Sequence, residues 1–307
     1  MTTPLWPGDA PFALFLSHDV DEVHDRGFYR TFGAVNHLRR VLAGSERGNA
    51  RACSRRILRA AFSPKDPRRQ FERILNIEAA FGWRSTFFFL EGYRWSRYGS
   101  RYRLDDPRVR ALAAMVLEAG CEIGVHGAYH DFNNPVGYRR SADRIEAVFG
   151  VRPIGIRNHF LRFSFPETWK AQADAGFVYD ATFGWNDRVG PRDDRWQPFE
   201  AHGPENGGGL GLVVLPLTVM DVTLFRRLRL DKAGALACLD DVFARAAAAG
   251  GLVTLLWHNN YFDEPEYAEW EEIYAEALRR AAGYRPYCAT GAEIAVWWRT
   301  HAGRPDA

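Results

Sequence analysis

The sequence predicts an α/β fold, a distorted (β/α) barrel of seven or eight parallel strands, formed by residues 1–307 as a single domain. Three observations lead to this prediction. Short apolar runs alternate with helical patterns over most of the chain, as in repeated βα units. No G-x-G-x-x-G motif follows the first strand, which argues against a dinucleotide-binding sheet. The alternation continues without a linker, which favours one barrel.

The expected strands are short apolar runs that are bounded by turn residues. They are Phe12–Ser17, Ser85–Leu90, Cys121–His126, Pro153–Asn158, Phe177–Asp180, Leu212–Leu217 and Leu252–His258, with a weaker one near Tyr287. Proline at a first turn and glycine after a last turn mark the expected helices. They are Pro67–Phe81, Pro107–Ala119, Arg139–Phe149, Pro166–Ala175, Lys232–Ala249 and Tyr267–Ala282.

The composition is that of an ordinary globular protein, with 47% hydrophobic and 25% charged residues. The formal net charge of +2 does not indicate nucleic acid as a partner. Four cysteines without a CxxC pair indicate neither a thiolate zinc site nor a disulfide framework. No basic region precedes the short apolar run at the N-terminus, and no apolar stretch approaches the roughly 20 residues that cross a bilayer. We therefore expect no signal peptide, no transmembrane segment and a cytoplasmic location.

Two segments interrupt the βα pattern. Residues 36–69 place ten Lys or Arg against Glu46 and Asp66, and we expect a basic helical insertion there. Two interpretations remain open: a solvated basic face, or a surface for an anionic partner such as a lipid or nucleotide phosphate, which would allow peripheral membrane contact. Residues 185–210 are rich in Gly, Pro and charge, and we expect a long loop on the barrel rim.

Ionisable and amide side chains gather where the predicted strands end, whereas the strand bodies are apolar. In parallel barrels this carboxyl edge holds the active site. The side chains at the edge, in chain order, are Asp19, Asp21, His126, His130, Arg157, Asn158, His159, Asp180, His258, Asn259 and Asn260. Scattered surface charge would not follow this boundary. The sequence therefore predicts an active site at this edge.

A metal site is the first hypothesis for these residues, because two His and one carboxylate with an open position form a known zinc site. His126 and His130 are four residues apart and can converge on one face of a helix or compact turn. Asp19 and Asp21 share one face of a strand, so one can bind the metal while the other accepts a proton. Each pair alone could instead consist of ordinary turn residues. Their joint placement at strand ends favours the metal site.

Three further residues at this edge carry open interpretations. His258 could be a packed core histidine beside Trp257, or a general acid facing the metal. Asp180 could hold an imidazole, or it could cap the following turn. Arg157 ends an apolar strand, where an unpaired guanidinium would be costly, so we expect it to pair with Asp19.

A family resemblance joins these residues. The ordered motifs "HDVD", "STFFFLEG", "EAGCEIGVHGAYH", "GIRNHFLRFSFPETW", "AGFVYDATFG" and "LLWHNN" resemble the polysaccharide deacetylase family, with the NodB homology domain of carbohydrate esterase family 4. The resemblance runs from about Phe12 to about Ala295 and is closest to a branch with Asp-x-Asp in place of an adjacent Asp pair.

The resemblance implies a distorted (β/α) barrel and metal-dependent removal of an N-acetyl group from a carbohydrate. It implies one divalent ion, Zn²⁺ in our expectation with Co²⁺, Ni²⁺ or Mn²⁺ as alternatives. The metal ligands matched by position are Asp21, His126 and His130. By the same match, Asp19 is the base and Arg157 orients it, while His258 is the acid that protonates the leaving amine. Asp180 lies where the family has an aspartate that tunes this histidine.

The substrate contacts are less closely defined by the motifs. The family usually follows the arginine with proline and an aromatic residue whose backbone N–H helps to hold the oxyanion, but this chain reads "RNHFLRF". Asn158 or His159 could supply that N–H. The expected substrate-binding residues are Asn158, His159, Trp185 and Asn259, and Trp95 and Trp196 could also stack on sugar rings.

We expect an N-acylated sugar as substrate, such as a glycan precursor for surface polysaccharide that is phosphate- or lipid-linked. Two alternatives stay open: a related metal-dependent amide hydrolase acting on an N-formyl sugar or a ureide, and a non-catalytic carbohydrate-binding relative. A binding module needs no proton-transfer pair, so the presence of both Asp19 and His258 argues against the second alternative.

Overall fold

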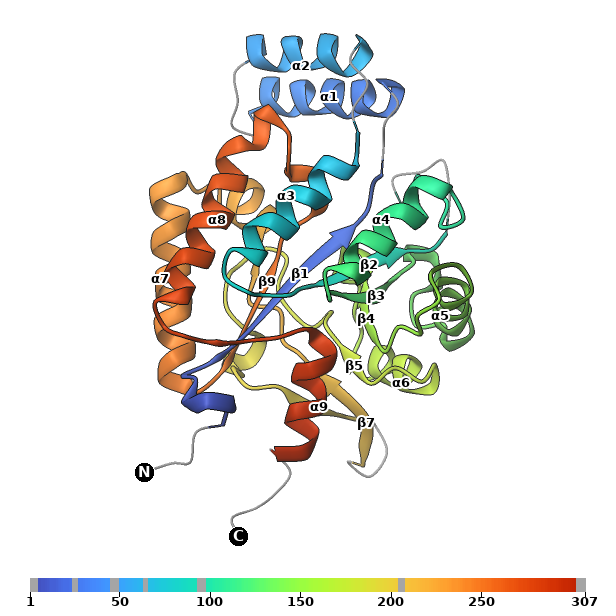
Figure 1. The fold of residues 1–307 in the computed structure, drawn as a ribbon, viewed down its shortest axis with the longest axis vertical. Helices are drawn as coiled ribbons and strands as arrows, with labels where there is room; N and C mark the ends of the chain where they lie inside the picture. Colours follow the sequence, from blue (N-terminus) through green and yellow to red (C-terminus); the bar gives the residue numbers. More distant parts are fainter. Residues whose placement is uncertain are drawn as a thin grey trace.

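The structure, a computed structural model, describes residues 5–23, 27–44, 50–62, 66–92, 98–203 and 208–301. Within these residues, ten strands form one curled sheet (Figure 1). The strands are β1 (Ala13–Val20), β2 (Thr86–Leu90), β3 (Glu122–Gly127), β4 (Gly155–Asn158), β5 (Tyr179–Asp180), β6 (Phe199–His202), β7 (Gly209–Val214), β8 (Val219–Met220), β9 (Leu252–Leu256) and β10 (Tyr287–Cys288). The predicted distorted barrel of parallel strands is confirmed.

The strand order is β6-β7-β5-β4-β3-β2-β1-β9-β8, and the end strands β6 and β8 do not pair with each other in the described part of the chain. Every pairing is parallel except β6 with β7. The short strand β10 pairs with the first residues of β1, and β2 pairs with its last residues. The carboxyl ends of neighbouring strands therefore meet along one edge.

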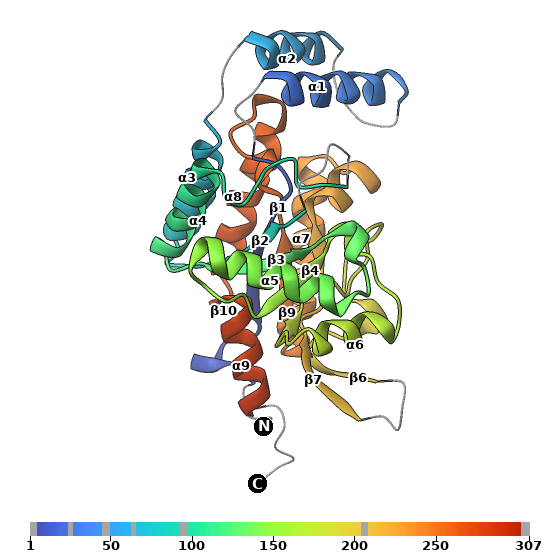
Figure 2. The same ribbon diagram turned by 90° about the vertical axis from the view of Figure 1, so that its right-hand side faces the viewer.

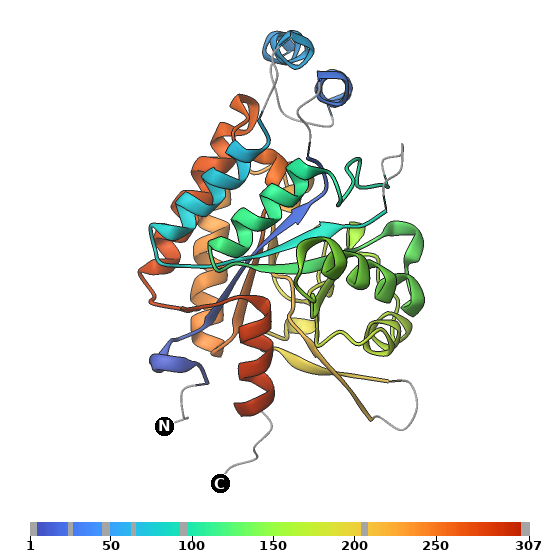
Figure 3. The same ribbon diagram turned by 45° about the vertical axis from the view of Figure 1, so that its right-hand side comes forward.

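Helices lie around this sheet and at its two ends (Figures 1 and 3). They are α1 (Gly27–Leu42), α2 (Ala50–Phe62), α3 (Arg68–Ala79), α4 (Pro107–Glu118), α5 (Pro135–Phe149), α6 (Glu167–Asp174), α7 (Lys232–Ala249), α8 (Ala268–Ala282) and α9 (Gly291–His301). The helices α3 to α8 follow the predicted βα pattern. No helix in the described ranges is both long enough and apolar enough to cross a bilayer.

The alternation of side chains along β1 divides the core into two layers. Leu14 and Leu16 point outward and pack with the helices. Phe15 points inward and packs with Phe88 in an inner layer. Ile294 of α9 belongs to this inner layer, and α9 lies at the end of the molecule opposite α1 and α2 (Figure 2). The inner side chains therefore fill the barrel below its carboxyl edge.

The basic segment at 36–69 lies mostly in helices α1 and α2, which pack on each other as a hairpin. This hairpin lies beyond the end of the barrel towards which β1 points, and His37 of α1 contacts Tyr267 there (Figures 1 and 2). Residues 45–49 and 63–65 of the predicted insertion lie outside the described residues.

The segment 185–210 differs from the predicted long loop. Residues 199–202 form β6, which pairs antiparallel with β7 and so extends the sheet. The sequence also placed one strand at Leu212–Leu217. In the structure β7 ends at Val214, and the separate short strand β8 begins only at Val219, after the predicted range. Residues 204–207 lie outside the described residues.

Candidate active site

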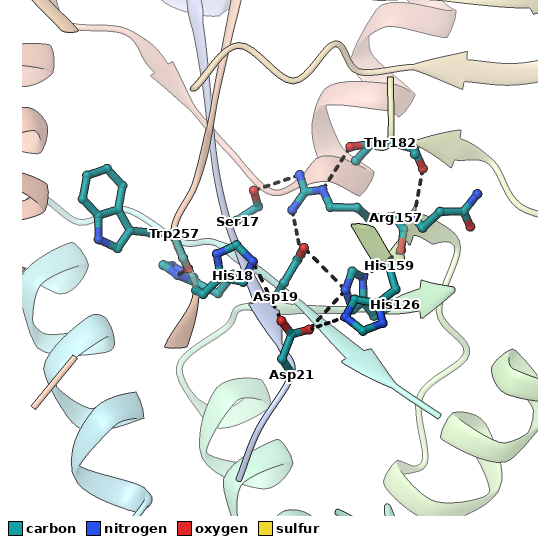
Figure 4. Close-up of polar contacts among 12 residues, drawn as sticks. Ser17, His18, Asp19, Asp21, His126, Arg157, His159, Thr182 and Trp257 are labelled. Atoms are coloured by element: carbon teal, nitrogen blue, oxygen red, sulfur yellow. Dashed lines mark hydrogen bonds and ion pairs between the residues drawn. The ribbon is translucent and has the colours of Figure 1, made fainter. Parts of the chain in front are cut away.

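Three side chains converge at the carboxyl end of β1 in a group that could hold a metal ion. One ligand atom each from Asp21, His126 and His159 lies within 4.8 Å of the other two (Figure 4). Asp21 follows β1, His126 lies in β3 and His159 follows β4. The Oδ1 atom of Asp21 is 3.3 Å from Nε2 of His126 and 3.6 Å from Nε2 of His159. Parallel pairing of β2 between β1 and β3 brings these residues together.

The hydrogen bonds of His126 suit a metal ligand. Its Nδ1 donates to the carbonyl of Arg157 over 2.8 Å, which leaves the Nε2 lone pair directed at Asp21 when the ring is neutral. Both Nε2 of His126 and Oδ1 of Asp21 are buried, and neither has a well-formed hydrogen-bond partner among the described residues. Buried polar atoms usually have partners, so a bound cation fits this pair of atoms.

Electrostatics favour a cation at the same point. Burial tends to lower the pKa of His126, but the carboxylates of Asp19 and Asp21 raise it overall. Burial lowers the pKa of His159 to about 4, so this imidazole is neutral near pH 7. A neutral imidazole is the form that binds metal, and a divalent cation would replace the proton on His126.

His159, rather than His130, completes the group of possible ligands. His130 lies in the short turn Tyr129–Asp131, where its exposed ring contacts the rings of Tyr98 and Tyr129. Residues i and i+4 share a face in an α-helix. His126 is in a strand and His130 is in a 3₁₀ turn, so that rule does not bring them together. Among the described residues, the structure therefore brings His159 to Asp21 and His126, whereas the predicted ligand His130 lies outside this group.

Asp19 forms the predicted pair with Arg157. The guanidinium Nη1 donates to Oδ1 of Asp19, Nη2 donates to Oγ of Ser17 and Nε donates to the carbonyl of Ala181, each over 3.0 Å (Figure 4). The guanidinium also lies over the ring of Phe88 at 4.5 Å. Burial tends to raise the pKa of Asp19, but His126 and Arg157 lower it, so the carboxylate is ionised. Its Oδ2 is 3.6 Å from Nε2 of His126, beside the possible ligands.

His258 lies across the site from this pair, and its partner is Asp221. Nδ1 of His258 is 2.8 Å from Oδ1 of Asp221, and the backbone N–H of His258 donates to Oδ2 over 2.7 Å. Its Nε2 is 3.9 Å from Oδ2 of Asp21. Burial tends to lower the pKa of His258, but Asp221 raises it to about 9. The imidazolium is therefore the main form near pH 7.

Asp180 does not contact His258, which corrects its predicted role. Its carboxylate accepts hydrogen bonds from the side chains of Trp169 and Gln172 and from the backbone N–H of Thr182. Burial raises its pKa. Asp180 therefore fixes α6 and the segment after β5 to the sheet, while Asp221 has the place next to the imidazole.

The site opens into a cavity of about 530 Å³. Its floor includes Asp19, Asp21, His126, His159 and His258. Its walls include Phe160, Leu161, Asn260 and Tyr261, with the arginines Arg40, Arg226 and Arg227. Phe160 and Leu161 have φ angles of 61° and 50°, in the left-handed region that such residues rarely occupy. Strained backbone of this kind is often found at functional sites.

No family model and no curated protein matches this sequence. Among the solved structures that match, two cover nearly the whole chain with TM-scores of 0.60 or more. One is assigned as a polysaccharide deacetylase from Mycobacterium smegmatis, with 22% identity, a TM-score of 0.62 and coverage of 98% of this chain and 97% of the other. The second is assigned as a polysaccharide deacetylase from Pseudomonas aeruginosa PAO1, with 16% identity, a TM-score of 0.60 and coverage of 100% and 96%. The chain has the polysaccharide deacetylase fold.

Within this deacetylase fold, the predicted substrate contacts divide into two sets. His159 lies in the cavity floor. Asn158 is buried, its backbone N–H donates to Oγ1 of Thr182, and so it cannot supply an oxyanion donor. Asn259 is buried and its amide donates to the carbonyl of Glu22. The neighbouring Asn260 lines the cavity instead.

Of the predicted tryptophan contacts, the two that the structure describes, Trp185 and Trp196, are not among the residues that line the cavity. Trp185 packs between the guanidinium groups of Arg188 and Arg192, at 4.6 and 4.5 Å from its ring. Trp196 is buried in the core. Trp95 lies outside the described residues.

Asp221 is the site residue that the sequence reasoning missed. It directly follows the short strand β8, so the rule that placed Asp19 and His258 at strand ends applies to it as well. No strand was predicted at Val219–Met220, so the end of this strand was not considered. His159 was found, but as a substrate contact, because nothing in "RNHFLRF" shows that a left-handed turn follows it.

Proposed function

We propose that this chain is a metal-dependent hydrolase that removes an N-acetyl group from a sugar. One observation carries the proposal: a paired carboxylate, a group of possible metal ligands and a protonated histidine share the floor of one cavity. The deacetylase fold supports this assignment, because its relatives are named for that reaction. A binding module would need neither the Asp19–Arg157 pair nor the His258–Asp221 pair.

The proposed ligands are Asp21, His126 and His159. Two imidazoles and one carboxylate are a ligand set of catalytic zinc, so we propose Zn²⁺. When bound, the ion would supply Lewis-acid polarisation of the acyl oxygen and would lower the pKa of water to about 7.

Asp19 is the proposed general base. Its carboxylate is ionised and lies beside the possible ligands, so it can accept a proton from the attacking water. Arg157 fixes Oδ1 of Asp19 and leaves Oδ2 directed towards His126. Ser17 and the carbonyl of Ala181 hold the guanidinium in turn. Arg157 therefore acts on the reaction through the orientation and charge of Asp19.

His258 is the proposed general acid. Its Nδ1–H donates to Asp221, so its Nε2–H faces the cavity and can protonate the leaving amine. Amines leave poorly without that proton. The backbone N–H of Asn158 is already used by Thr182, so the backbone N–H of His159 is the remaining predicted donor to the oxyanion. The products would be a carboxylate and a free amino sugar.

The cavity walls support a sugar substrate that carries negative charge. Phe160 is 51% exposed and lines the cavity, so its ring is available to stack on a sugar. Three arginines, Arg40, Arg226 and Arg227, come from α1 and from the π-helical turn Thr223–Arg227. Such a cationic wall suits a phosphate- or carboxylate-bearing glycan precursor.

The test is a substrate screen combined with metal analysis. Purified protein is incubated with N-acetyl and N-formyl sugars, each in neutral and phosphorylated form, and the products are identified by mass spectrometry. We expect release of acetate, about one equivalent of zinc per chain, and loss of activity after chelation that zinc restores. Binding of sugars without acyl release from any of them would contradict the proposal. A preference for N-formyl sugars would show that the acyl group removed is formyl and not acetyl.

A further inference from the structure

The hairpin of α1 and α2 has a charge composition unlike the rest of the chain. Helix α1 carries three arginines and α2 carries four, and neither helix contains Asp or Glu. The whole chain, by contrast, has nearly balanced charges, with 40 basic and 38 acidic residues. The positive charge is therefore concentrated on this hairpin.

Helix α1 exposes large apolar side chains on one face. Phe32 is 57% exposed and Leu42 is 70% exposed, with Val35 between them. At 100° per residue these positions, together with the exposed Arg39, fall within one narrow arc of the helix. Ala34, on the other side of the helix, is fully buried. The exposed arc thus combines apolar side chains with an arginine.

Helix α2 repeats the same arrangement. Arg51, Arg55 and Leu58 are exposed and fall on one face, and the exposed fraction of Leu58 is 60%. Cys53 lies on the opposite face and is buried. Helix α2 packs on α1, and His37 of α1 contacts the ring of Tyr267 in the barrel, with the centroids 6.0 Å apart. The hairpin therefore has one side that packs within the protein and another, amphipathic side that is exposed.

The exposed side chains distinguish among three possible partners: a second copy of the hairpin, a nucleic acid and an anionic bilayer surface. A second copy of the hairpin would bring arginine against arginine, which disfavours self-association. A nucleic acid would attract the arginines but would leave Leu42 and Leu58 without an apolar environment. An anionic bilayer surface satisfies both, because the headgroups attract arginine and the acyl boundary accepts leucine and phenylalanine.

We propose that the α1–α2 hairpin docks the protein on a membrane surface rich in anionic lipid. The hairpin lies at the end of the barrel where the strands end, and Arg40 of α1 lines the cavity (Figures 1 and 3). Docking through the hairpin would therefore bring the cavity close to the lipid headgroups. This inference concerns the hairpin alone and holds whichever acyl group the site removes.

Vesicle co-sedimentation of the full chain tests the proposal. One set of vesicles contains equal amounts of phosphatidylglycerol and phosphatidylcholine, and the other contains phosphatidylcholine alone. We expect binding to the first set, weaker at high salt, and none to the second. The triple variant Phe32→Ser, Leu42→Ser, Leu58→Ser should bind at least about tenfold more weakly. The double variant Arg39→Gln, Arg55→Gln should lose about fivefold for each arginine.

The matched control replaces an equally exposed apolar residue outside the hairpin. Val136, at the start of α5, is 69% exposed, and Val136→Ser should bind like the wild type. All of these positions are at the surface, so folding and turnover of a soluble substrate should be unchanged. Failure of the wild type to bind anionic vesicles would overturn the proposal.

Two other outcomes would also overturn it by identifying a different partner. The triple variant could still bind the vesicles, and a DNA duplex could compete this binding away. That result would identify the hairpin as a general surface for polyanions. Dimers that the same triple variant disrupts, detected by sedimentation velocity, would mark a contact between two copies.

Discussion

Two aspartates in one short motif have different partners, and this difference defines their chemistry. Asp19 and Asp21 both point into the barrel, but only Asp19 contacts Arg157. Asp21 faces His126, His159 and His258. These contacts suit the roles proposed for them, Asp19 as the base and Asp21 as a metal ligand. His18, between Ser17 and Asp19, points outward to Glu78 and the carbonyl of Trp257, as the strand alternation predicts.

Asp19→Asn should separate the base from the metal site. The amide cannot accept the proton, so we expect kcat to fall by about 10²- to 10⁴-fold while zinc remains bound. Asp187→Asn, at an exposed position, is the control. Kinetics and metal analysis on the same samples check this. Full activity in Asp19→Asn would refute the assignment of the base.

His159→Ala and His130→Ala distinguish the two candidates for the third ligand. We expect His159→Ala to lose zinc affinity by more than about 100-fold, beyond the usual effect of a residue that only supports a ligand. His130→Ala should retain zinc, because this exposed side chain lies outside the group. Competition with a chelator measures both affinities. The opposite ranking would restore His130 as the ligand.

Asp221→Asn should shift the pH dependence of activity. His258 must be protonated to act as an acid, so activity is lost as the pH rises through its pKa of about 9. Removing the charge of Asp221 lowers that pKa, and the alkaline limb should move to lower pH by about two units. The measurement is kcat against pH. Asp180→Asn is the control, and an unmoved limb in Asp221→Asn would exclude the proposed pair.

At the scale of elements, close packing between neighbouring strands fixes the position of the site residues. Gly155 begins β4, which carries Arg157, and it faces Tyr179 of β5. A Cβ on Gly155 would lie 1.9 Å from Cζ of Tyr179. Tyr179 is fully buried and its hydroxyl donates to Glu122 over 3.0 Å, so it has little room to move.

Gly155→Ala should therefore destabilise the protein. Overpacking of a core typically costs about 1–3 kcal/mol, and we expect this variant at the upper end. Gly208→Ala is the matched control, since a Cβ there meets no atom within 4 Å. Thermal and urea unfolding compare the two variants with the wild type. Equal stability of both would show that Tyr179 can move aside.

At the scale of the whole molecule, the site connects strands from distant parts of the sequence. The group of possible metal ligands joins β1, β3 and the end of β4, and His258 directly follows β9 and Trp257. A cation held there links segments more than 100 residues apart. Binding to the folded chain alone must stabilise it.

Zinc should therefore raise the melting temperature. At 100 times Kd the expected stabilisation is about 2.7 kcal/mol, or roughly 4 °C for a chain of this size. Differential scanning fluorimetry with zinc and with a chelator measures it. The shift should be absent in His159→Ala and present in Asp19→Asn. A zinc shift of equal size in both variants would place the ion elsewhere.

Local patterns in the sequence determined the barrel class, most strands and helices, and the edge that holds the site. These features follow from short-range physics: alternation in strands, glycine and proline at helix ends, and polar residues at strand ends. Asp19, Asp21, His126, Arg157 and His258 were accessible in this way because each continues or ends a predicted strand.

Only the tertiary structure decided which residues become partners. His159 takes the place predicted for His130 because a left-handed turn follows β4, and backbone angles of that kind leave no periodic pattern. Asp221, not Asp180, holds His258 because β8 pairs directly with β9, whereas β5 lies on the other side of β4. Spacing in the sequence determines which residues share a face of one helix or strand. Partners from different strands depend on the strand order, which spacing does not encode.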